Sequence, residues 1–219
     1  MSHLPFTLLA YFLNSISVTI NKVLLKKTIP DPFVYIFYVS VFSLILLPGI
    51  FFTHVPPYFA LILASISTIC WTIGAYFMFK ALKVGLVSRV IPVIGTLIPL
   101  ILLIDASSKS AISTNQTWAI YFLTLGIVFI TILDWKGRVQ KKEIIFEIVS
   151  AILFAISYIL LREAYLKADF FSVLVWSRLV LIPLIILTLT LPYLRKRVLS
   201  SNSHKVNFFG KAGALFLLG

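Results

Sequence analysis

Residues 57–79, PYFALILASISTICWTIGAYFMF, contain no charged side chain. A helix of about 20 mostly apolar residues crosses the hydrocarbon core of a bilayer, so this stretch predicts a membrane-spanning helix. Similar apolar stretches lie on either side of it. The sequence therefore predicts an all-α, polytopic membrane helix bundle with about seven spans, at residues 4–24, 32–53, 57–79, 85–104, 115–133, 144–162 and 170–192, and a partial eighth from Val206.

The composition of the whole chain agrees with a membrane protein. Of its 219 residues, 60% are hydrophobic and 12% are charged, and the mean hydropathy is +1.06. Soluble domains carry about 25% charged residues, and the core of a small domain cannot hide so much apolar surface from water. The first apolar run, from Leu4, is too long for a signal-peptide core and lacks a cleavage pattern, so we expect it to be a retained span.

Lys and Arg are unevenly distributed over the connections between the expected spans. Fourteen lie in the first, third, fifth and seventh connections, and three lie in the second, fourth and sixth. The positive-inside rule then predicts that the odd connections are cytoplasmic and the N-terminus is outside. With a net charge of +12, the chain is expected to meet anionic lipid and no nucleic acid, because its basic residues flank apolar runs.

An internal repeat relates the start of the chain to its second half. The matching pairs are residues 12–17 (FLNSIS) with 152–157 (ILFAIS), Lys22 with Arg162, and residues 31–33 (DPF) with 169–171 (DFF). Because an odd number of spans, five, separates the copies, the second copy would be inverted. Inverted repeats are typical of secondary transporters, which bind their solute between the two halves. Chance similarity between apolar helices is the alternative explanation.

Several short motifs occur in a characteristic order: residues 14–22 (NSISVTINK), 75–82 (AYFMFKAL), 88–92 (SRVIP), 98–100 (IPL), 124–128 (TLGIV) and Arg178. In this order they resemble EamA-type members of the drug/metabolite transporter superfamily. The resemblance implies inverted five-helix repeats and a carrier that moves small organic solutes, such as metabolites or drugs, by alternating access, with export favoured over import. It divides the chain into a first repeat (1–134), a basic linker (135–142) and a partial second repeat (143–219).

The sequence departs from the family pattern in two places. Residues 104–108, IDASS, stand where the family usually has a Gly-Glu pair, and the chain stops at Gly219 inside the expected eighth span. We therefore expect a C-terminally truncated form of a ten-span carrier with an incomplete second repeat. The family's general topology places the N-terminus in the cytoplasm, opposite to the charge distribution, and both orientations stay open.

Polar side chains within the expected spans form a candidate substrate-binding site. Asn14, Ser17 and Asn21 follow one face of the first helix. They predict either a wall of a solute path or hydrogen bonds that hold the bundle together. One face of the third helix carries Thr68, Trp71, Thr72 and Tyr76, for which ordinary packing is the alternative.

The fourth and seventh spans supply the remaining candidates. Pro92 and Pro99 are expected to break the fourth helix beside Thr96, since proline lacks a backbone donor and broken helices often mark transporter sites. Arg89, at the start of that helix, is expected to meet lipid headgroups. Arg178 lies about nine residues into the seventh span, where a charge is costly and indicates a functional site or an internal pair.

Other functions have less support in the sequence. The three histidines lie outside the expected spans, and no serine-hydrolase, zinc-protease or nucleotide-binding motif occurs, so we predict no enzyme, metal or cofactor. The alternatives are a non-transporting truncated membrane protein and a seven-helix receptor-like protein. The expected location is the cell membrane, multi-pass, as in a bacterial or archaeal inner membrane. The expected partners are a small-molecule solute and the lipid bilayer, and a homodimer stays open.

Overall fold

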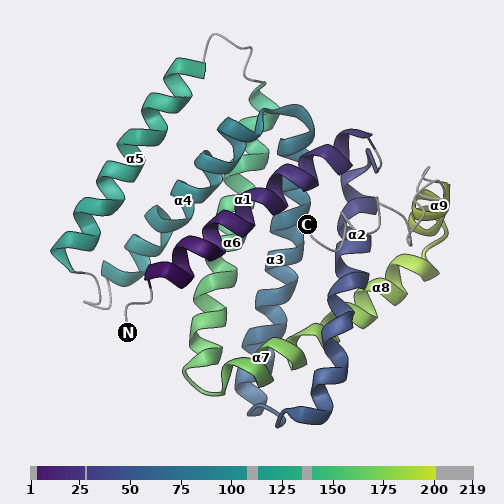
Figure 1. Ribbon diagram of the computed structural model, residues 1–219. Coiled ribbons are helices and arrows are strands. Elements are labelled where there is room, and N and C mark those ends of the chain that lie inside the picture. The colour runs from purple at the N-terminus through teal and green to yellow at the C-terminus, as the bar shows by residue number, and fades with distance from the viewer. Residues whose placement is uncertain (1–3, 28, 108–112, 135–139, 201–219) are drawn as a thin grey trace.

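The computed structural model describes residues 4–27, 29–107, 113–134 and 140–200. Within these residues all regular secondary structure is helical (Figure 1), which confirms the all-α prediction. Those labelled η are 3₁₀ helices. In chain order the helices are α1 (Leu4–Lys27), α2 (Pro32–Ser43), η1 (Leu44–Phe52), α3 (Tyr58–Val84), α4 (Val87–Ser107), α5 (Thr114–Asp134), α6 (Lys141–Tyr165), α7 (Phe170–Trp176), η2 (Ser177–Val180), α8 (Leu181–Thr190) and α9 (Pro192–Ser200).

Several helical segments have the length and composition that a bilayer requires. Five are long and apolar enough to cross a membrane: Pro5–Lys27, Pro32–Phe52, Tyr58–Val84, Lys141–Tyr165 and Phe170–Thr190. A shorter apolar helix, Val87–Ile101, lies within α4. Lys141 and Lys142 of the expected basic linker belong to α6, and the division of the chain into two repeats stays a prediction. The eighth run, from Val206, and residues 135–139 lie outside the described residues, and the count of seven spans stays a prediction.

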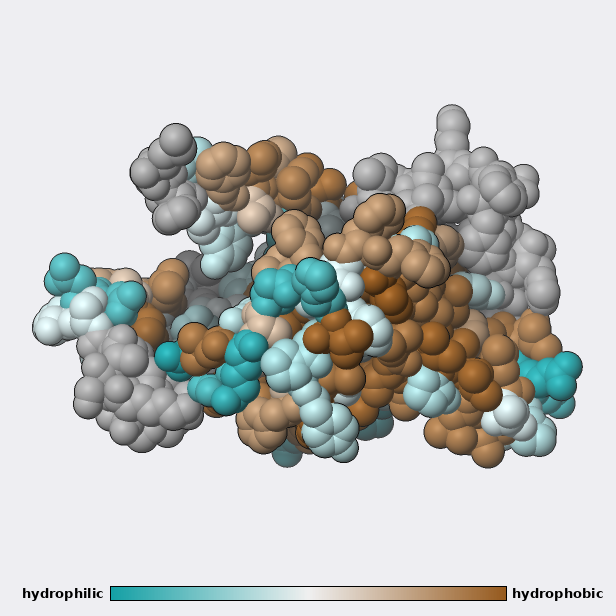
Figure 2. All heavy atoms as spheres, turned by 90° about the horizontal axis from the view of Figure 1, so that it is seen from below, coloured by the Kyte–Doolittle hydropathy of each residue, from teal (hydrophilic) through white to brown (hydrophobic). Residues whose placement is uncertain are grey.

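Large apolar side chains cover the outside of the bundle. Phe51 and Phe52 are 88% and 90% exposed. Seen from the end at which α7 lies, hydrophobic side chains cover most of the coloured surface and hydrophilic ones form separate groups (Figure 2). Polar side chains, including Ser67, Ser150 and Ser157, are buried instead. Such an apolar exterior is unfavourable in water and suits hydrocarbon, so the protein is membrane-embedded.

Two aspartates begin helices in the same way. The Asp31 carboxylate accepts a hydrogen bond from the Phe33 amide at 2.9 Å and caps α2. The Asp169 carboxylate accepts one from the Ser172 amide at 2.9 Å and caps α7. These are the two aspartates that the internal repeat pairs. N-terminal capping at both positions agrees with the proposed repeat, of which residues 201–219 lie outside the described residues.

The helices that follow these aspartates both change to 3₁₀ geometry partway along. η1 contains Pro48, and η2 ends shortly before Pro183. Proline removes one backbone donor and disfavours a regular α-helix before it. Pro92 and Pro99, by contrast, lie inside α4, which runs from Val87 to Ser107 as one helix. The structure thus shows no interruption at the predicted break and shows two elsewhere.

The central contact of the bundle joins α3 to α6. The Ser150 hydroxyl donates to the Gly74 carbonyl at 2.9 Å. A Cβ atom on Gly74 would lie 3.1 Å from the Phe154 ring, so a glycine lets the two helices approach closely. Buried alanines, including Ala75 and Ala151, line the same contact. Small residues at such an interface are typical of membrane helices, which associate by close packing and hydrogen bonds.

Contacts between connections place several basic segments at one end of the bundle. Lys22, near the end of α1, donates to the carbonyl of Gly85, which follows α3, at 2.7 Å. Arg197 of α9 pairs with Asp31, which precedes α2. We call this the basic end, and the α3–α4 turn and the start of α6 also lie there (Figure 1). The α6–α7 turn lies at the opposite end. This arrangement agrees with the predicted alternation of connections.

Candidate solute-binding cavity

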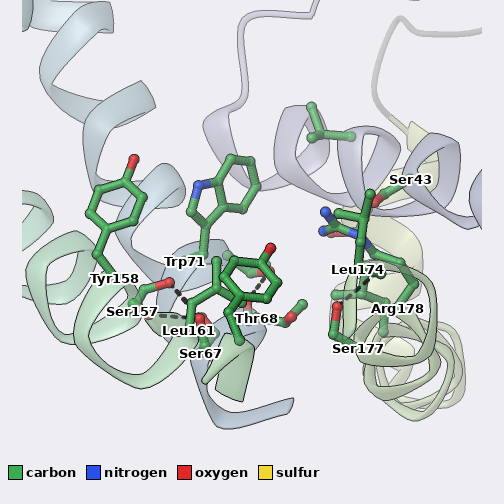
Figure 3. Close-up of a pocket in the computed structure, with 15 residues that line it drawn as sticks. Ser43, Ser67, Thr68, Trp71, Ser157, Tyr158, Leu161, Leu174, Ser177 and Arg178 are labelled. Atoms are coloured by element: carbon green, nitrogen blue, oxygen red, sulfur yellow. Dashed lines mark hydrogen bonds between the residues drawn. The ribbon is translucent and has the colours of Figure 1, made fainter. Parts of the chain in front are cut away.

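A cavity of about 230 Å³ lies between α2, α3, α6 and the α7–η2–α8 segment (Figure 3). Nine of its fifteen lining residues carry a hydroxyl group and one, Arg178, is charged. The hydroxyl groups and the guanidinium on this wall give a polar solute hydrogen-bonding partners that the surrounding hydrocarbon cannot offer. The lining residues are Val39, Ser40, Ser43, Ser67, Thr68, Trp71, Thr72, Ser157, Tyr158, Leu161, Tyr165, Leu174, Ser177, Arg178 and Leu181.

Arg178 occupies the 3₁₀ turn η2. Its Nε atom is buried and has no hydrogen-bond partner among the described residues. In Figure 3 its guanidinium group and Ser43 lie on one side of the cavity, across from the rings of Trp71 and Tyr158. None of the described residues on the cavity wall carries a carboxylate. The internal-pair explanation for Arg178 therefore finds no partner in the part of the chain that the structure describes.

Hydroxyl groups that α3 and α6 contribute to the cavity wall already donate their protons within the protein. Thr68 donates to the Ala64 carbonyl at 2.9 Å, and Thr72 donates to the Thr68 carbonyl at 2.8 Å. Ser67 and Ser157 donate to each other's carbonyls at 2.8 and 3.0 Å. A hydroxyl has one proton and two lone pairs. These oxygens therefore offer acceptor capacity to anything that occupies the cavity.

Three of the predicted site residues meet at this cavity. Trp71 and Thr72 reach it from α3, and Arg178 reaches it from η2, more than 100 positions later in the chain. Thr68, which was predicted on the same helix face, lines it as well. The face of α3 and the intramembrane arginine, which were identified independently in the sequence, therefore converge on one site.

The predicted stripe on α1 lies away from the cavity. Asn21 is buried, and its side-chain oxygen accepts a hydrogen bond from the Tyr35 hydroxyl at 2.5 Å. Asn14 is exposed and Ser17 is half-buried, and neither lines the cavity. For Asn21, the structure favours the interpretation that these polar groups hold helices together. Thr96 is buried in α4, also apart from the cavity.

Tyr76 lines a second pocket, which opens at the basic end and has a volume of about 370 Å³. Lys80 also lines it, with its ammonium group 5.0 Å from the centre of the Tyr76 ring and 4.6 Å from that of Phe146. Lys83 and Arg197 add further positive charge. Tyr76 thus belongs to an aromatic and basic environment near the membrane interface instead of the central cavity.

Several lining residues were not predicted from the sequence. Ser40 and Ser43 reach the cavity from α2, and Tyr158 and Tyr165 reach it from α6. Ser40 and Ser43 are three residues apart, and the two tyrosines are seven apart, so each pair shares a helix face. This spacing was a usable signal. Which faces turn toward one another, however, depends on packing between helices.

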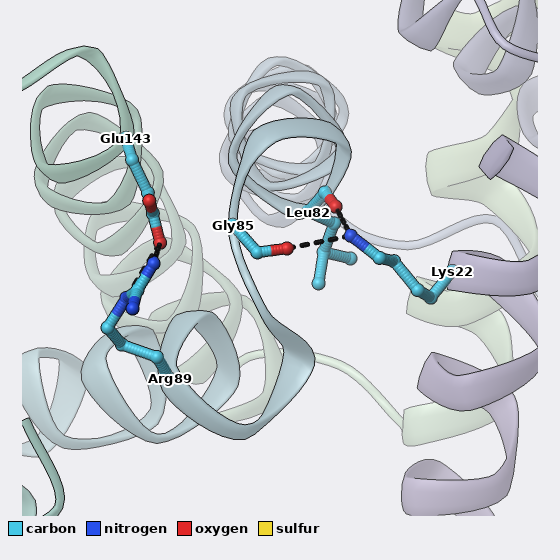
Figure 4. Close-up of polar contacts among 5 residues, drawn as sticks. All are labelled: Lys22, Leu82, Gly85, Arg89 and Glu143. Atoms are coloured by element: carbon cyan, nitrogen blue, oxygen red, sulfur yellow. Dashed lines mark hydrogen bonds and ion pairs between the residues drawn. The ribbon is translucent and has the colours of Figure 1, made fainter. Parts of the chain in front are cut away.

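Polar contacts near the basic end link α1 to the end of α3 and, separately, α4 to α6 (Figure 4). The Arg89 guanidinium pairs with the Glu143 carboxylate at 2.6 Å, and Arg89 is only 5% exposed. The expectation that Arg89 meets lipid headgroups is therefore wrong, because the start of α6 covers it. Lys22 donates to the carbonyls of Leu82 and Gly85, which satisfies acceptors at the end of α3.

A second ion pair lies outside the membrane-spanning segments. Arg197 donates two hydrogen bonds to the Asp31 carboxylate, at 2.6 and 2.9 Å, and its guanidinium carbon lies 5.1 Å from the centre of the Phe33 ring. Partial burial alone would raise the pKa of Asp31. The hydrogen bonds from Arg197 and the Phe33 amide, together with the charge of Arg197, outweigh burial and hold that pKa below its usual value.

Within the described ranges, no group of three or more His, Cys, Asp or Glu side chains is placed to hold a metal ion. Comparisons with models of protein families, with curated proteins and with solved structures find no match. The similarity to EamA-type transporters therefore rests on the quoted residues alone.

Proposed function

We propose that this protein is a membrane carrier of the EamA type that moves small organic solutes by alternating access, with export favoured over import. One observation carries the proposal: a cavity lined by hydroxyl groups and by a half-buried arginine lies inside a bundle whose exterior is apolar. Ionisable residues within a membrane bundle commonly mark solute or ion pathways.

The position of the cavity supports a carrier. α2 and α3 belong to the first proposed repeat, and α6, α7 and η2 belong to the second. Secondary transporters bind their solute at such a boundary and expose it to each side in turn by moving one half against the other. The 3₁₀ turn that carries Arg178 also resembles the interrupted helices of transporter sites.

The charge distribution supports an orientation. Lys26, Lys27 and Lys141 flank helices at the basic end, and basic residues next to spans favour the cytoplasmic side. We therefore propose a multi-pass protein of the cell membrane, bacterial or archaeal, with its basic end in the cytoplasm.

The test uses the purified chain in liposomes loaded with a defined mixture of small metabolites, with efflux followed by mass spectrometry. We expect at least one solute to leave with saturable kinetics, and Arg178→Gln to slow its efflux at least tenfold. Arg195→Gln is the matched control, because Arg195 is an exposed arginine of α9 that does not line the cavity. If no solute leaves faster than it leaves protein-free liposomes loaded with the same mixture, the protein is not a carrier of these solutes.

A further inference from the structure

The described wall of the central cavity carries a positive charge without a negative charge to balance it. Among the residues that the structure describes, Arg178 is the one charged residue on the cavity wall, and no carboxylate forms an ion pair with it. A charged group within a bilayer is costly unless something compensates it. A cationic solute would add a second positive charge, and a neutral solute would leave the guanidinium uncompensated. An anionic group beside Arg178 satisfies both its charge and its unused Nε–H.

The hydroxyl groups that α3 contributes to the cavity wall need a hydrogen-bond donor, whereas Arg178 needs an acceptor. The hydroxyl protons of Thr68 and Thr72 are committed to helix carbonyls. Their remaining lone pairs accept hydrogen bonds. A buried acceptor is more favourable when a donor reaches it. A solute that carries a hydroxyl or amino group at its far end would therefore fit better than a plain hydrocarbon tail.

The volume limits the size of the solute. A cavity of about 230 Å³ corresponds to roughly eight water molecules at about 30 Å³ each. This is below the range of about 300–1,000 Å³ that is usual for drug-sized ligands. A compact solute therefore fits the cavity better than a nucleotide or a large lipophilic drug does.

We infer that the solute is a compact organic anion, with its acidic group at Arg178 and a hydrogen-bond donor facing Thr68 and Thr72. This inference rests on the proposed carrier function and names its substrate class. In this inference Arg178 of η2 binds the acidic group of the solute, and Thr68 and Thr72 of α3 accept hydrogen bonds from its donor.

Direct binding tests the inference without requiring flux. Purified protein in nanodiscs is equilibrated with radiolabelled glycerate, which is an anion with hydroxyl donors and is small enough for the cavity. Propionate, which lacks the donors, and glycerol, which lacks the charge, are the comparison probes. We expect glycerate to bind at least tenfold more tightly than either, since each comparison probe leaves one wall unsatisfied.

Substitutions test the roles of Arg178 and Thr72 separately. Arg178→Gln is expected to weaken glycerate binding at least tenfold, whereas Arg195→Gln leaves it unchanged. Thr72→Val keeps the shape of the side chain and removes an acceptor, so it is expected to weaken glycerate and spare propionate. Equal binding of glycerate and glycerol, or glycerate binding that is insensitive to Arg178→Gln, would overturn the inference.

Glycerate binding and solute efflux together distinguish a failure of the proposed carrier function from a failure of the inferred substrate class. Glycerate binding that depends on Arg178, without efflux from liposomes, would keep the substrate class and reject the carrier. Saturable efflux of a neutral or cationic solute, without glycerate binding, would keep the carrier and reject the anion.

Discussion

Arg89 and Glu143 are 54 residues apart in the chain, yet their side chains meet at 2.6 Å and tie the start of α4 to the start of α6. Their side chains are 6% and 1% exposed. Burial of two charges costs much of what their attraction contributes, so the pair adds little net stability. Loss of one partner, by contrast, destabilises the fold, because it leaves a buried charge without compensation.

Breaking this pair on one side is expected to destabilise the fold strongly. Glu143→Gln or Arg89→Met should each lower the free energy of unfolding by about 3–5 kcal/mol. The double variant Arg89→Met/Glu143→Leu should lose less than the sum of the single changes, because neither charge remains. Denaturant unfolding in detergent, followed by circular dichroism, measures all three. The exposed neighbour Lys142→Met is the control, and additive losses would show that the two residues act independently.

The turn between α3 and α4 gives a sharper steric test. A Cβ atom on Gly85 would lie 2.1 Å from the Glu143 carboxylate oxygen and 2.8 Å from Val90. Gly85→Ala should therefore displace the carboxylate from Arg89 and cost about 1–3 kcal/mol, as other overpacked sites do. Gly95→Ala is the matched control, since nothing lies within 4 Å of its Cβ position, and alanine should add about 0.5–1 kcal/mol to the helix. Equal stability of the two variants in thermal unfolding would disprove the contact.

How far sequence reasoning reaches depends on the range of the interaction. Apolar runs such as residues 57–79 predicted the helices, because the length of a run sets whether it can cross a bilayer. Asp31 and Asp169 were matched by a local pattern, and both cap helices. Trp71, Thr72 and Arg178 were found because their types are unusual inside apolar helices.

The missed features depend on contacts between distant segments. Arg89 looked interfacial because the sequence shows its position at a helix end but not the Glu143 carboxylate opposite it. Ser40 and Tyr158 reach the cavity only because α2 and α6 turn those faces inward. The position of the helix interruption was also mispredicted, since α4 accommodates both of its prolines as membrane helices often do.

The Asp31–Arg197 pair predicts an acid-sensitive contribution to stability. The pKa of Asp31 in the folded state is held below its usual value, which in the unfolded state is about 3.9. The pair therefore stabilises the fold above about pH 4, and this contribution disappears as the pH falls through the folded-state pKa.

Substitution separates the charge of Asp31 from its helix cap. Asp31→Asn keeps a capping oxygen and should lose only about 0.5–1 kcal/mol at neutral pH, because the pair is partly exposed. Asp31→Ala should lose about 1 kcal/mol more with the cap. Thermal unfolding between pH 7 and pH 3 tests both. A parallel pH dependence in wild type and Asp31→Asn would assign the acid sensitivity to other groups.

Glu147 lies one helical turn beyond Glu143 on α6, and the two carboxylates should respond to substitution in opposite directions. Glu147 is 3% exposed, and its Oε1 atom has no hydrogen-bond partner among the described residues. A buried carboxylate with one oxygen left without a hydrogen bond is unfavourable, whereas glutamine has nearly the same shape and no charge. We expect Glu147→Gln to raise the free energy of unfolding by about 1–3 kcal/mol, while Glu143→Gln lowers it. The two variants form a matched pair, because they make the same chemical change on the same helix. Loss of stability in Glu147→Gln would show that the carboxylate has a compensating partner.

Solute efflux from liposomes measures whether Glu147 also serves transport. If Glu147→Gln is more stable than the wild type but transports more slowly, the charge of Glu147 is retained for transport at the expense of stability.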